Sequence, residues 1–233
     1  METVSARQIH DQAEKMREDG DFSKALQLTD QAMIAYQKEG NIAGFAEILA
    51  SRFLIFRHLY EETNDKNYLI LAKHITMASV EIAQNSKNPQ ALAIPLFNLA
   101  KVQEVLGELS QACQTYQEAL DDFTQNPPKE HNRPAVLADI KIHLYISQAK
   151  NGDQSALEKA IDALKELENS DEEKYNKDVW LSGAHMKLAE ILSVTNPEAA
   201  KEHLQKAKVI IDNNPDLKLR AKQWEKLTEK LRS

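Results

Sequence analysis

Apolar residues recur along the chain at helical spacing, in runs that short polar breaks interrupt. Residues 107–120 read GELSQACQTYQEAL, with apolar or small residues returning every three or four positions, which is typical of an amphipathic helix. Residues 20–32, GDFSKALQLTDQA, have the same shape. Residues 45–60, FAEILASRFLIFRHLY, are apolar on nearly every face, as expected of a helix buried between neighbours. The pattern predicts an all-α protein.

Five polar breaks divide this pattern at nearly constant intervals. Their first residues are Gly20, Asn64, Gly107, Gly152 and Thr195, which lie 44, 43, 45 and 43 positions apart. A glycine can adopt the left-handed conformation that ends a helix, and a following acid or amide accepts the free N–H groups of the next helix. Each break therefore predicts a tight turn within a helix hairpin, near residues 20, 64, 107, 152 and 195.

Several residues have the sequence spacing of a helix N-terminus, either between these hairpins or within them. Ser155, Ser170 and Thr195 each precede a glutamate by three positions, a spacing that favours a helix N-terminus. Pro95 falls within an apolar run, where proline breaks the hydrogen-bond ladder of a helix. That helix is therefore expected either to kink or to begin later than Pro89 suggests.

One hairpin of two such helices buries little apolar surface alone. Stacking successive hairpins buries a continuous core, which gains about 1.5–3 kcal/mol for each fully buried large aliphatic side chain. We therefore expect a single helical-repeat domain over residues 1–233. Its last helix, about 216–232, should be a capping helix because its apolar residues form one stripe: Leu217, Ala221, Trp224, Thr228 and Leu231.

Two of the hairpins carry a pattern that resembles the tetratricopeptide repeat (TPR). In the third hairpin the matching positions are Leu96, Leu99, Ala100, Gly107, Leu109, Ala112, Tyr116 and Ala119. In the first they are Ile9, Ala13, Met16, Gly20, Phe22, Ala25 and Ala32. The period of about 44 residues exceeds the usual 34, so the chain is similar to divergent, long-repeat members of this superfamily. HEAT-like repeats have a closer period but do not explain a Gly-acid turn followed by spaced alanines. The resemblance implies a right-handed TPR-like α-solenoid of about five antiparallel helix pairs plus a C-terminal capping helix.

The resemblance also implies a binding surface, because TPR arrays typically hold a peptide or partner protein on the concave face of their first helices. Counting back from the turns places these candidates for partner binding on that face: Leu54, His58, Phe97, Asn98, Lys101, Ile142 and His143. The alternative is that Leu54, Phe97 and Ile142 pack against neighbouring helices. The carboxylate clamp of chaperone-binding members requires Lys, Asn and Arg at set places. Only Asn98 fits it, so this clamp is not expected.

Composition and charge limit the classes of partner that the protein is expected to bind. The formal net charge of −7 disfavours nucleic acid, whose binding depends on neutralising phosphates. Residues 199–233 contain nine basic and five acidic residues. This basic region could contact an acidic partner, a membrane surface or nucleic acid, but its interleaved glutamates favour a solvated helix face. No apolar run is long enough to span a membrane, and charges interrupt the first 25 residues. We therefore expect no membrane insertion and a cytoplasmic location.

The sequence contains no constellation typical of catalysis. It has no Gly-rich phosphate loop and no HExxH or nucleophile-elbow motif, and its single cysteine, Cys113, is expected to be a buried structural thiol. His10 and Glu14 lie one turn apart, which is more typical of a surface contact than of a metal site. We expect no enzyme activity, cofactor or metal. The leading hypothesis is a protein- or peptide-binding scaffold or adaptor, and the alternative is a regulator that senses a peptide or small ligand.

Overall fold

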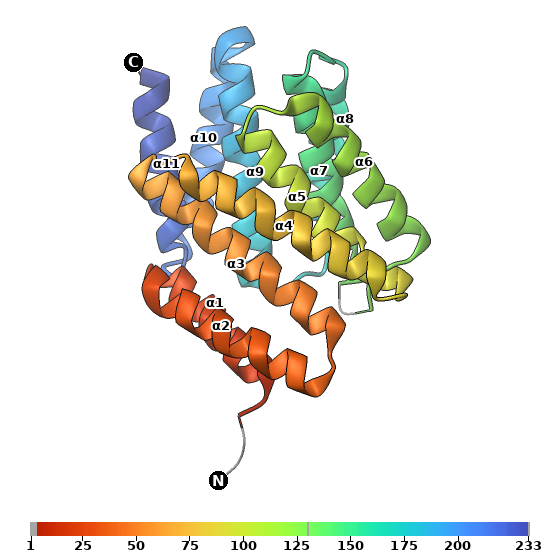
Figure 1. The fold of residues 1–233 in the computed structure, drawn as a ribbon. Helices are drawn as coiled ribbons and strands as arrows, with labels where there is room; N and C mark the ends of the chain where they lie inside the picture. Colours follow the sequence, from red (N-terminus) through yellow and green to blue (C-terminus); the bar gives the residue numbers. More distant parts are fainter. Residues whose placement is uncertain (1–3, 130, 233) are drawn as a thin grey trace. The chain divides into compact units, whose positions relative to one another are not determined.

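The computed structural model describes residues 4–129 and 131–232, and within these ranges it contains helices and no strands (Figure 1). A 3-10 helix, η1 (Pro89–Ala91), precedes the fifth α-helix. The α-helices in chain order are α1 (Ala6–Glu18), α2 (Phe22–Glu39), α3 (Ile42–Thr63), α4 (Asn67–Asn85), α5 (Ala93–Val105), α6 (Leu109–Gln125), α7 (Pro134–Lys150), α8 (Ala156–Glu168), α9 (Lys174–Thr195), α10 (Pro197–Asp212) and α11 (Lys218–Arg232).

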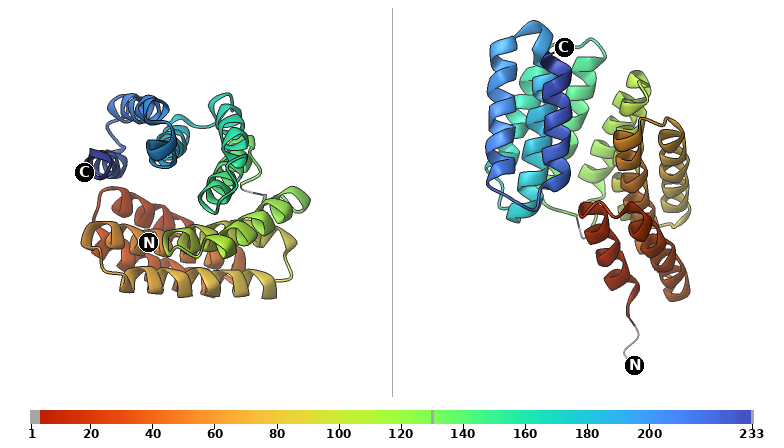
Figure 2. Two further views of the ribbon diagram at one scale, coloured as in Figure 1. Left: turned by 90° about the horizontal axis from the view of Figure 1, so that it is seen from above. Right: turned by 90° about the vertical axis from the view of Figure 1, so that its left-hand side faces the viewer.

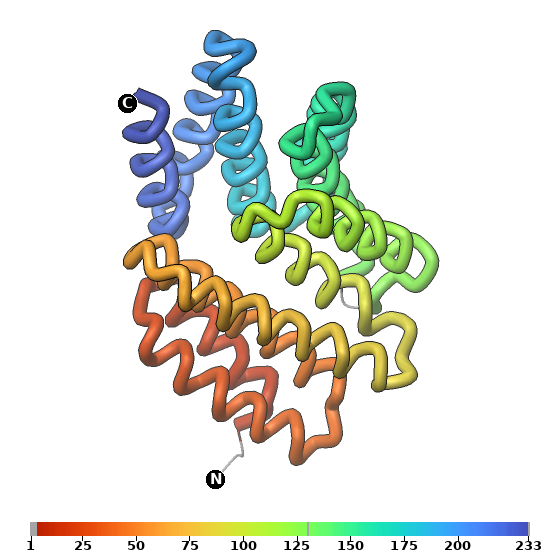
Figure 3. Tube along the Cα trace, turned by 45° about the horizontal axis from the view of Figure 1, so that its top comes forward, coloured from red at the N-terminus to blue at the C-terminus, as the bar shows by residue number. Residues whose placement is uncertain are grey.

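Successive helices form five pairs, α1–α2, α3–α4, α5–α6, α7–α8 and α9–α10, and α11 follows the last pair. The chain reverses direction at the turn within each pair, as the trace in Figure 3 shows for α9 and α10. The turns lie near residues 20, 64, 107, 152 and 195, so the predicted helix pairs and last helix are confirmed.

The chain divides into two compact units, Unit 1 (Met1–His131) and Unit 2 (Asn132–Ser233). In Unit 1 the first helices contact one another, α1 with α3 and α3 with α5, while each second helix packs on the first helix of the next pair. In Unit 2, α9 contacts both α7 and α11, and Figure 2 shows α9, α10 and α11 nearly end-on beside one another. The expectation of a single domain over residues 1–233 stays a prediction.

The turns follow the predicted chemistry in four of the five pairs. Gly20, Gly107 and Gly152 have φ values of 82°, 80° and 109°, and Asn64 has a φ of 57°. Such positive values are available to glycine without cost and are tolerated by asparagine. The fifth turn differs, because Asn196 is extended, with a φ of −149°, and its side chain accepts a hydrogen bond from Ala199 N.

Of the three predicted helix starts, Ser155 is confirmed as the N-cap residue of α8, whereas Ser170 and Thr195 are wrong. Asp153 accepts hydrogen bonds from the N–H and hydroxyl of Ser155, at 3.1 and 2.6 Å, so the aspartate supports the start of α8. Ser170 instead donates its hydroxyl to Leu167 O at the end of α8, and Thr195 is the last residue of α9. The side chains of Glu173 and Asn196 cap α9 and α10 instead.

Pro95 lies in the first turn of α5, which begins at Ala93 and not at Pro89. Proline is tolerated in a first turn because its missing N–H has no intrahelical partner there. Pro89 instead opens the short η1, where Asn88 accepts a hydrogen bond from Gln90 N. The prediction of a late start, the second of the two alternatives, is confirmed.

Each unit contains its own apolar core. In Unit 1, Phe53, Phe56, Ala72 and Val102 pack together, and α3 buries side chains on several of its faces, as predicted. In Unit 2 the core includes Ile142, Ile146, Leu164, Leu167 and Leu188. Of the stripe predicted for the last helix, Leu217 is buried just before α11, and Ala221, Trp224, Thr228 and Leu231 are half-buried. Leu219, which lies outside that stripe, is buried as well, and Trp224 Nε1 donates to Leu204 O.

Candidate functional site

A cavity of about 350 Å³ lies in Unit 1 at the amino-terminal ends of α1, α3 and α5. This volume is at the lower end of the roughly 300–1,000 Å³ typical of ligand pockets. The lining residues come from the starts of α1, α3 and α5, from the end of α2 and η1, and from the segment after α6. They are Ser5, Arg7, Tyr36, Glu39, Asn41, Ala43, Gly44, Ala46, Glu47, Ala50, Asn88, Gln90, Ala91, Ile94, Pro95, Pro128, Lys129 and His131.

Small residues on α3 form one wall of this cavity. Ala43, Gly44, Ala46 and Ala50 all line it. Gly44 is required for the packing of α2 on α3, because a Cβ atom there would lie 2.3 Å from Cε1 of Tyr36. The glycine therefore allows the tyrosine ring to lie directly against the backbone of α3, at the edge of the cavity.

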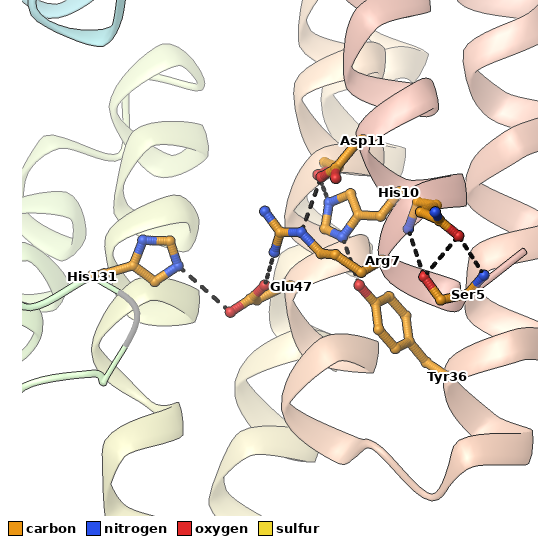
Figure 4. A network of polar contacts seen from close by, with 9 residues as sticks. Ser5, Arg7, His10, Asp11, Tyr36, Glu47 and His131 are labelled. Atoms are coloured by element: carbon orange, nitrogen blue, oxygen red, sulfur yellow. Dashed lines mark hydrogen bonds and ion pairs between the residues drawn. The ribbon is translucent and has the colours of Figure 1, made fainter. Parts of the chain in front are cut away.

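Charged side chains at the cavity contact one another, as Figure 4 shows. Arg7 lies 2.9 Å from Asp11 Oδ1 and 3.3 Å from Glu47 Oε2, and His131 Nε2 lies 3.5 Å from Glu47 Oε1. Burial alone would raise the pKa of Glu47, but the hydrogen bond from His131 and the charges of His131 and Arg7 outweigh it. The pKa of Glu47 therefore lies below its ordinary value, and this carboxylate is ionised at neutral pH.

A chain of buried polar contacts between α1 and α3 starts at the cavity. The hydroxyl of Tyr36 is 3.1 Å from His10 Nδ1, and His10 Nε2 is 2.7 Å from the hydroxyl of Ser51. Burial raises the pKa of Tyr36 to about 12 and lowers the pKa of His10, despite the nearby charge of Glu14. The expected surface contact of His10 with Glu14 is wrong, because His10 is only 5% exposed and its ring is held by Tyr36 and Ser51.

The same polar chain continues toward the other end of α1. Glu14 accepts a hydrogen bond from Arg17 at 2.6 Å, Arg17 Nη1 lies 3.2 Å from His58 Nε2, and His58 Nδ1 lies 3.1 Å from Glu61 Oε2. The ring of His58 also stacks on Phe22, with centroids 5.9 Å apart. Burial lowers the pKa of His58 more than Glu61 raises it, so this histidine is neutral at pH 7.

The structure separates the predicted partner-binding residues into two groups. In Unit 1, His58, Phe97 and Asn98 are buried, with 6%, 5% and 8% of their surface exposed, whereas Leu54 and Lys101 are half-buried. The ammonium of Lys101 lies 3.7 Å above the ring of Phe97, which also packs on Tyr116.

The other two predicted residues belong to Unit 2. Ile142 is fully buried in the core of that unit, and His143 is half-buried with its Nε2 3.8 Å from Asp139 Oδ1. Partner binding by the seven predicted residues stays a prediction, and Leu54, Lys101 and His143 are the more accessible of them.

Sequence reasoning missed the cavity residues Arg7, Glu47 and His131. The signal that was available is the set of small residues in the first half of α3, AGFA followed by Ala50. Small side chains at helical spacing leave space on one helix face, but they do not say what lies opposite. That depends on the placement of α1 and η1, which are distant in sequence.

The structure also shows the surroundings of the single thiol and of two histidines in Unit 2. Cys113, expected to be buried, is half-buried. In Unit 2, Nδ1 of His185 and Nδ1 of His203 are 2.9 Å apart. Burial, followed by the charges of His203 and Lys206, lowers the pKa of His185 to about 3.

Within residues 4–129 and 131–232, no three His, Cys, Asp or Glu side chains are grouped to hold a metal ion. None of the described helices is long and apolar enough to cross a membrane.

No protein-family model matches the chain, and no curated protein matches it. Several solved structures are similar to it, and two of them illustrate the likeness. BtubC (BKLC) from P. vanneervenii is 19% identical with a TM-score of 0.59, covering 89% of this chain and 80% of that one. The TPR-like repeats of a Podosopora anserina putative kinesin light chain are 16% identical with a TM-score of 0.56, covering 90% of this chain and 97% of that one. These similarities confirm the TPR-like helical-repeat fold.

Proposed function

We propose that this protein is a non-enzymatic scaffold that holds a segment of a partner protein against the first helices of Unit 1. The observation that carries the proposal is the open cavity at the amino-terminal ends of α1, α3 and α5, in a chain with a TPR-like fold. Helical-repeat arrays expose such first-helix surfaces along their length, and a partner segment is bound by pockets that accept its side chains.

The character of the cavity supports binding. Its wall of small side chains on α3 is apolar, and its rim carries Arg7, Glu47 and His131. An apolar wall with a few polar groups is typical of sites that fix the orientation of a ligand. The charged groups at the rim are engaged with one another, which favours recognition over catalysis. Leu54 follows Ala50 by one turn of α3 and would extend the surface beyond the cavity.

Site-specific photo-crosslinking tests this proposal. A photoreactive phenylalanine derivative replaces Ala43, which is exposed and lines the cavity, or Ala78, which is exposed on α4 and serves as the control. Irradiation in cells of the source organism should give a discrete protein adduct at Ala43, identified by mass spectrometry, and none at Ala78.

The identified partner is then measured with purified proteins. Ala43→Arg should weaken its binding at least about tenfold, because the new side chain occupies the cavity, while Ala78→Arg should leave the affinity unchanged. Both alanines are exposed, so neither change should unfold the helices. Equal adducts at the two positions, or equal affinities of the two variants, would count against a partner site at the cavity.

One observation favours a second candidate, a sensor that responds to a peptide or small ligand. Tyr36 lines the cavity and is also the first member of the buried polar chain through His10 and Ser51. A ligand that moves Tyr36 would alter the contact of α1 with α3. Hydrogen exchange of α1 amides with and without the identified partner separates the two candidates. Faster or slower exchange throughout α1 would favour the sensor, and unchanged exchange beyond the cavity would favour the scaffold.

A further inference from the structure

The carboxylate of Glu47 is a half-buried charge whose contacts are long. Its side chain is 25% exposed, and its partners among the described residues are Arg7 at 3.3 Å and His131 at 3.5 Å. Charge-assisted hydrogen bonds to a carboxylate are typically about 2.7–2.9 Å long. An ionised carboxylate offers about four acceptor sites. Glu47 therefore retains acceptor capacity that a donor entering the cavity can use.

Part of the cavity wall beside this carboxylate is apolar. Ala43, Ala46 and Ala50 line the cavity on α3, the helix that also carries Glu47, and Pro95 lines it from α5. A side chain bound against these residues would have aliphatic surface and a carboxylate within reach. This combination matches the amphipathic side chains of Arg and Lys, which place their stems on apolar surface and their charged heads at polar partners.

The charge of Unit 1 also favours a cation. Residues 1–131 contain 12 Lys and Arg against 19 Asp and Glu, whereas residues 132–233 contain 17 of each kind, so Unit 1 carries the whole net charge of −7. Such a field attracts cationic segments over distances of about 10 Å at moderate salt.

The ion pair between Arg7 and Glu47 is weak. The Arg7 side chain is 59% exposed, and ion pairs between exposed side chains add little stability. An incoming guanidinium can therefore replace Arg7 at Glu47 with little loss, leaving Arg7 its second contact with Asp11 at 2.9 Å. Lys129 and His131 also line the cavity and oppose a cation, and the carboxylate of Glu39, which lines it too, offsets part of this effect.

We propose that the cavity of Unit 1 binds an arginine side chain of a basic partner segment, with the stem on the small residues of α3 and the guanidinium on Glu47. This inference rests on the proposed scaffold function and names the chemistry of its partner. Arginine fits better than lysine because its planar guanidinium can pair with a carboxylate through two parallel hydrogen bonds.

The test uses the full chain, labelled with nitrogen-15, and a small probe, Nα-acetyl-arginine amide. Titration should give saturable shifts of the backbone amide signals of Gly44 and Ala50. Nα-acetyl-citrulline amide has nearly the same shape without the charge and should bind at least about tenfold more weakly. Nα-acetyl-glutamate amide should bind more weakly than the arginine probe.

Variants of the cavity test whether the arginine probe binds at Glu47. Glu47→Gln should weaken the arginine probe at least about tenfold, and the matched control Glu81→Gln should leave its affinity unchanged. Glu81 is an exposed acid on α4 that does not line the cavity, and its replacement changes the charge of Unit 1 equally. Ala50→Leu narrows the cavity from the α3 side and should also weaken the probe, which provides an independent check if Glu47→Gln lowers the melting temperature.

The inference is overturned if citrulline binds as well as arginine, if the glutamate probe binds more tightly, or if Glu47→Gln and Glu81→Gln have equal effects. It is also overturned if the arginine probe gives no shifts. In that last case adduct formation at Ala43 still decides the scaffold function separately, because crosslinking does not depend on the charge of the partner.

Discussion

His185 is a buried histidine whose titration should control the acid stability of Unit 2. It lies on α9 with 2% of its surface exposed, and its Nδ1 is 2.9 Å from Nδ1 of His203 on α10. Glu168 Oε1, from α8, lies 3.8 Å from its Nε2, and Lys206 contributes a further positive charge. Burial, then the charges of His203 and Lys206, lower the pKa of His185 to about 3.

The sign and size of the effect follow from the two pKa values of this group. In the unfolded chain His185 has a pKa of about 6.5, so between pH 6.5 and 3 the unfolded state binds a proton that the folded state does not. The free energy of unfolding therefore falls as pH falls through this window. At pH 5 the difference of 1.5 pH units corresponds to about 2 kcal/mol, at about 1.36 kcal/mol for each unit. The pKa values of His203, His10 and His58 are also lowered, so these groups further reduce the free energy of unfolding as pH falls.

The perturbation is His185→Gln, which removes this titration and retains a polar side chain. Urea unfolding is measured at pH 7 and pH 5, with tryptophan fluorescence as the signal. The two tryptophans, Trp180 and Trp224, are both in Unit 2, so this signal reports the unit that contains His185. The wild type should lose about 2 kcal/mol more than the variant between these pH values.

The control is His74→Gln, at an exposed histidine on α4 in Unit 1, which should lose as much stability as the wild type. The interval from pH 7 to pH 5 lies above the ordinary pKa values of carboxyl groups, so their protonation contributes little. If His185→Gln and the wild type lose equal stability between pH 7 and pH 5, then His185 is not a neutral, buried group, and the argument fails.

Two further predictions concern Unit 1. Gly44→Ala should destabilise this unit by about 1–3 kcal/mol, because its Cβ would lie 2.3 Å from the ring of Tyr36. Its control is Gly183→Ala, where the atom nearest to the new Cβ is the flexible end of Arg220 at 3.0 Å. The gain in helix propensity should make this control neutral or stabilising in thermal melts. Equal melting temperatures of the two variants would contradict the packing argument. Tyr36→Phe removes a hydrogen bond to buried His10 and should cost about 1–3 kcal/mol, and an unchanged chemical-denaturation midpoint would show that this contact contributes nothing.

The helix pairs could be predicted because the chemistry of turns is local. Gly20, Gly107 and Gly152 adopt positive φ values that few other residues accept, and Asp21 accepts a hydrogen bond from Lys24 N at the start of α2. These requirements involve only a few neighbouring residues, so they are visible in one sequence. Their regular spacing then identifies a repeat without further information.

The side-chain caps of the helices and the cavity could not be predicted for a related physical reason. Ser155 is the N-cap residue of α8, but Asp153 accepts its N–H, so the sequence alone does not show which of these two polar side chains supports the helix start. The cavity depends on which groups face the small residues of α3, and these include Arg7, which is 40 positions before Glu47, and His131, which is 84 positions after it. His58, expected on an open surface, is buried because Arg17 of α1 and Phe22 of α2 close over it.

The polar chain between α1 and α3 contrasts with the apolar core of Unit 2. Buried hydrogen bonds contribute little net stability, but a buried polar group that loses its partner costs about 1–3 kcal/mol. A shift of α1 along α3 by one turn would break the contacts of His10 with Ser51 and of Arg17 with His58 together. These contacts therefore hold the first helix pair in one register more strictly than an aliphatic interface would. Because Arg7 lies on the same helix and reaches Glu47 on α3, that fixed register also determines the position of the charged groups at the cavity.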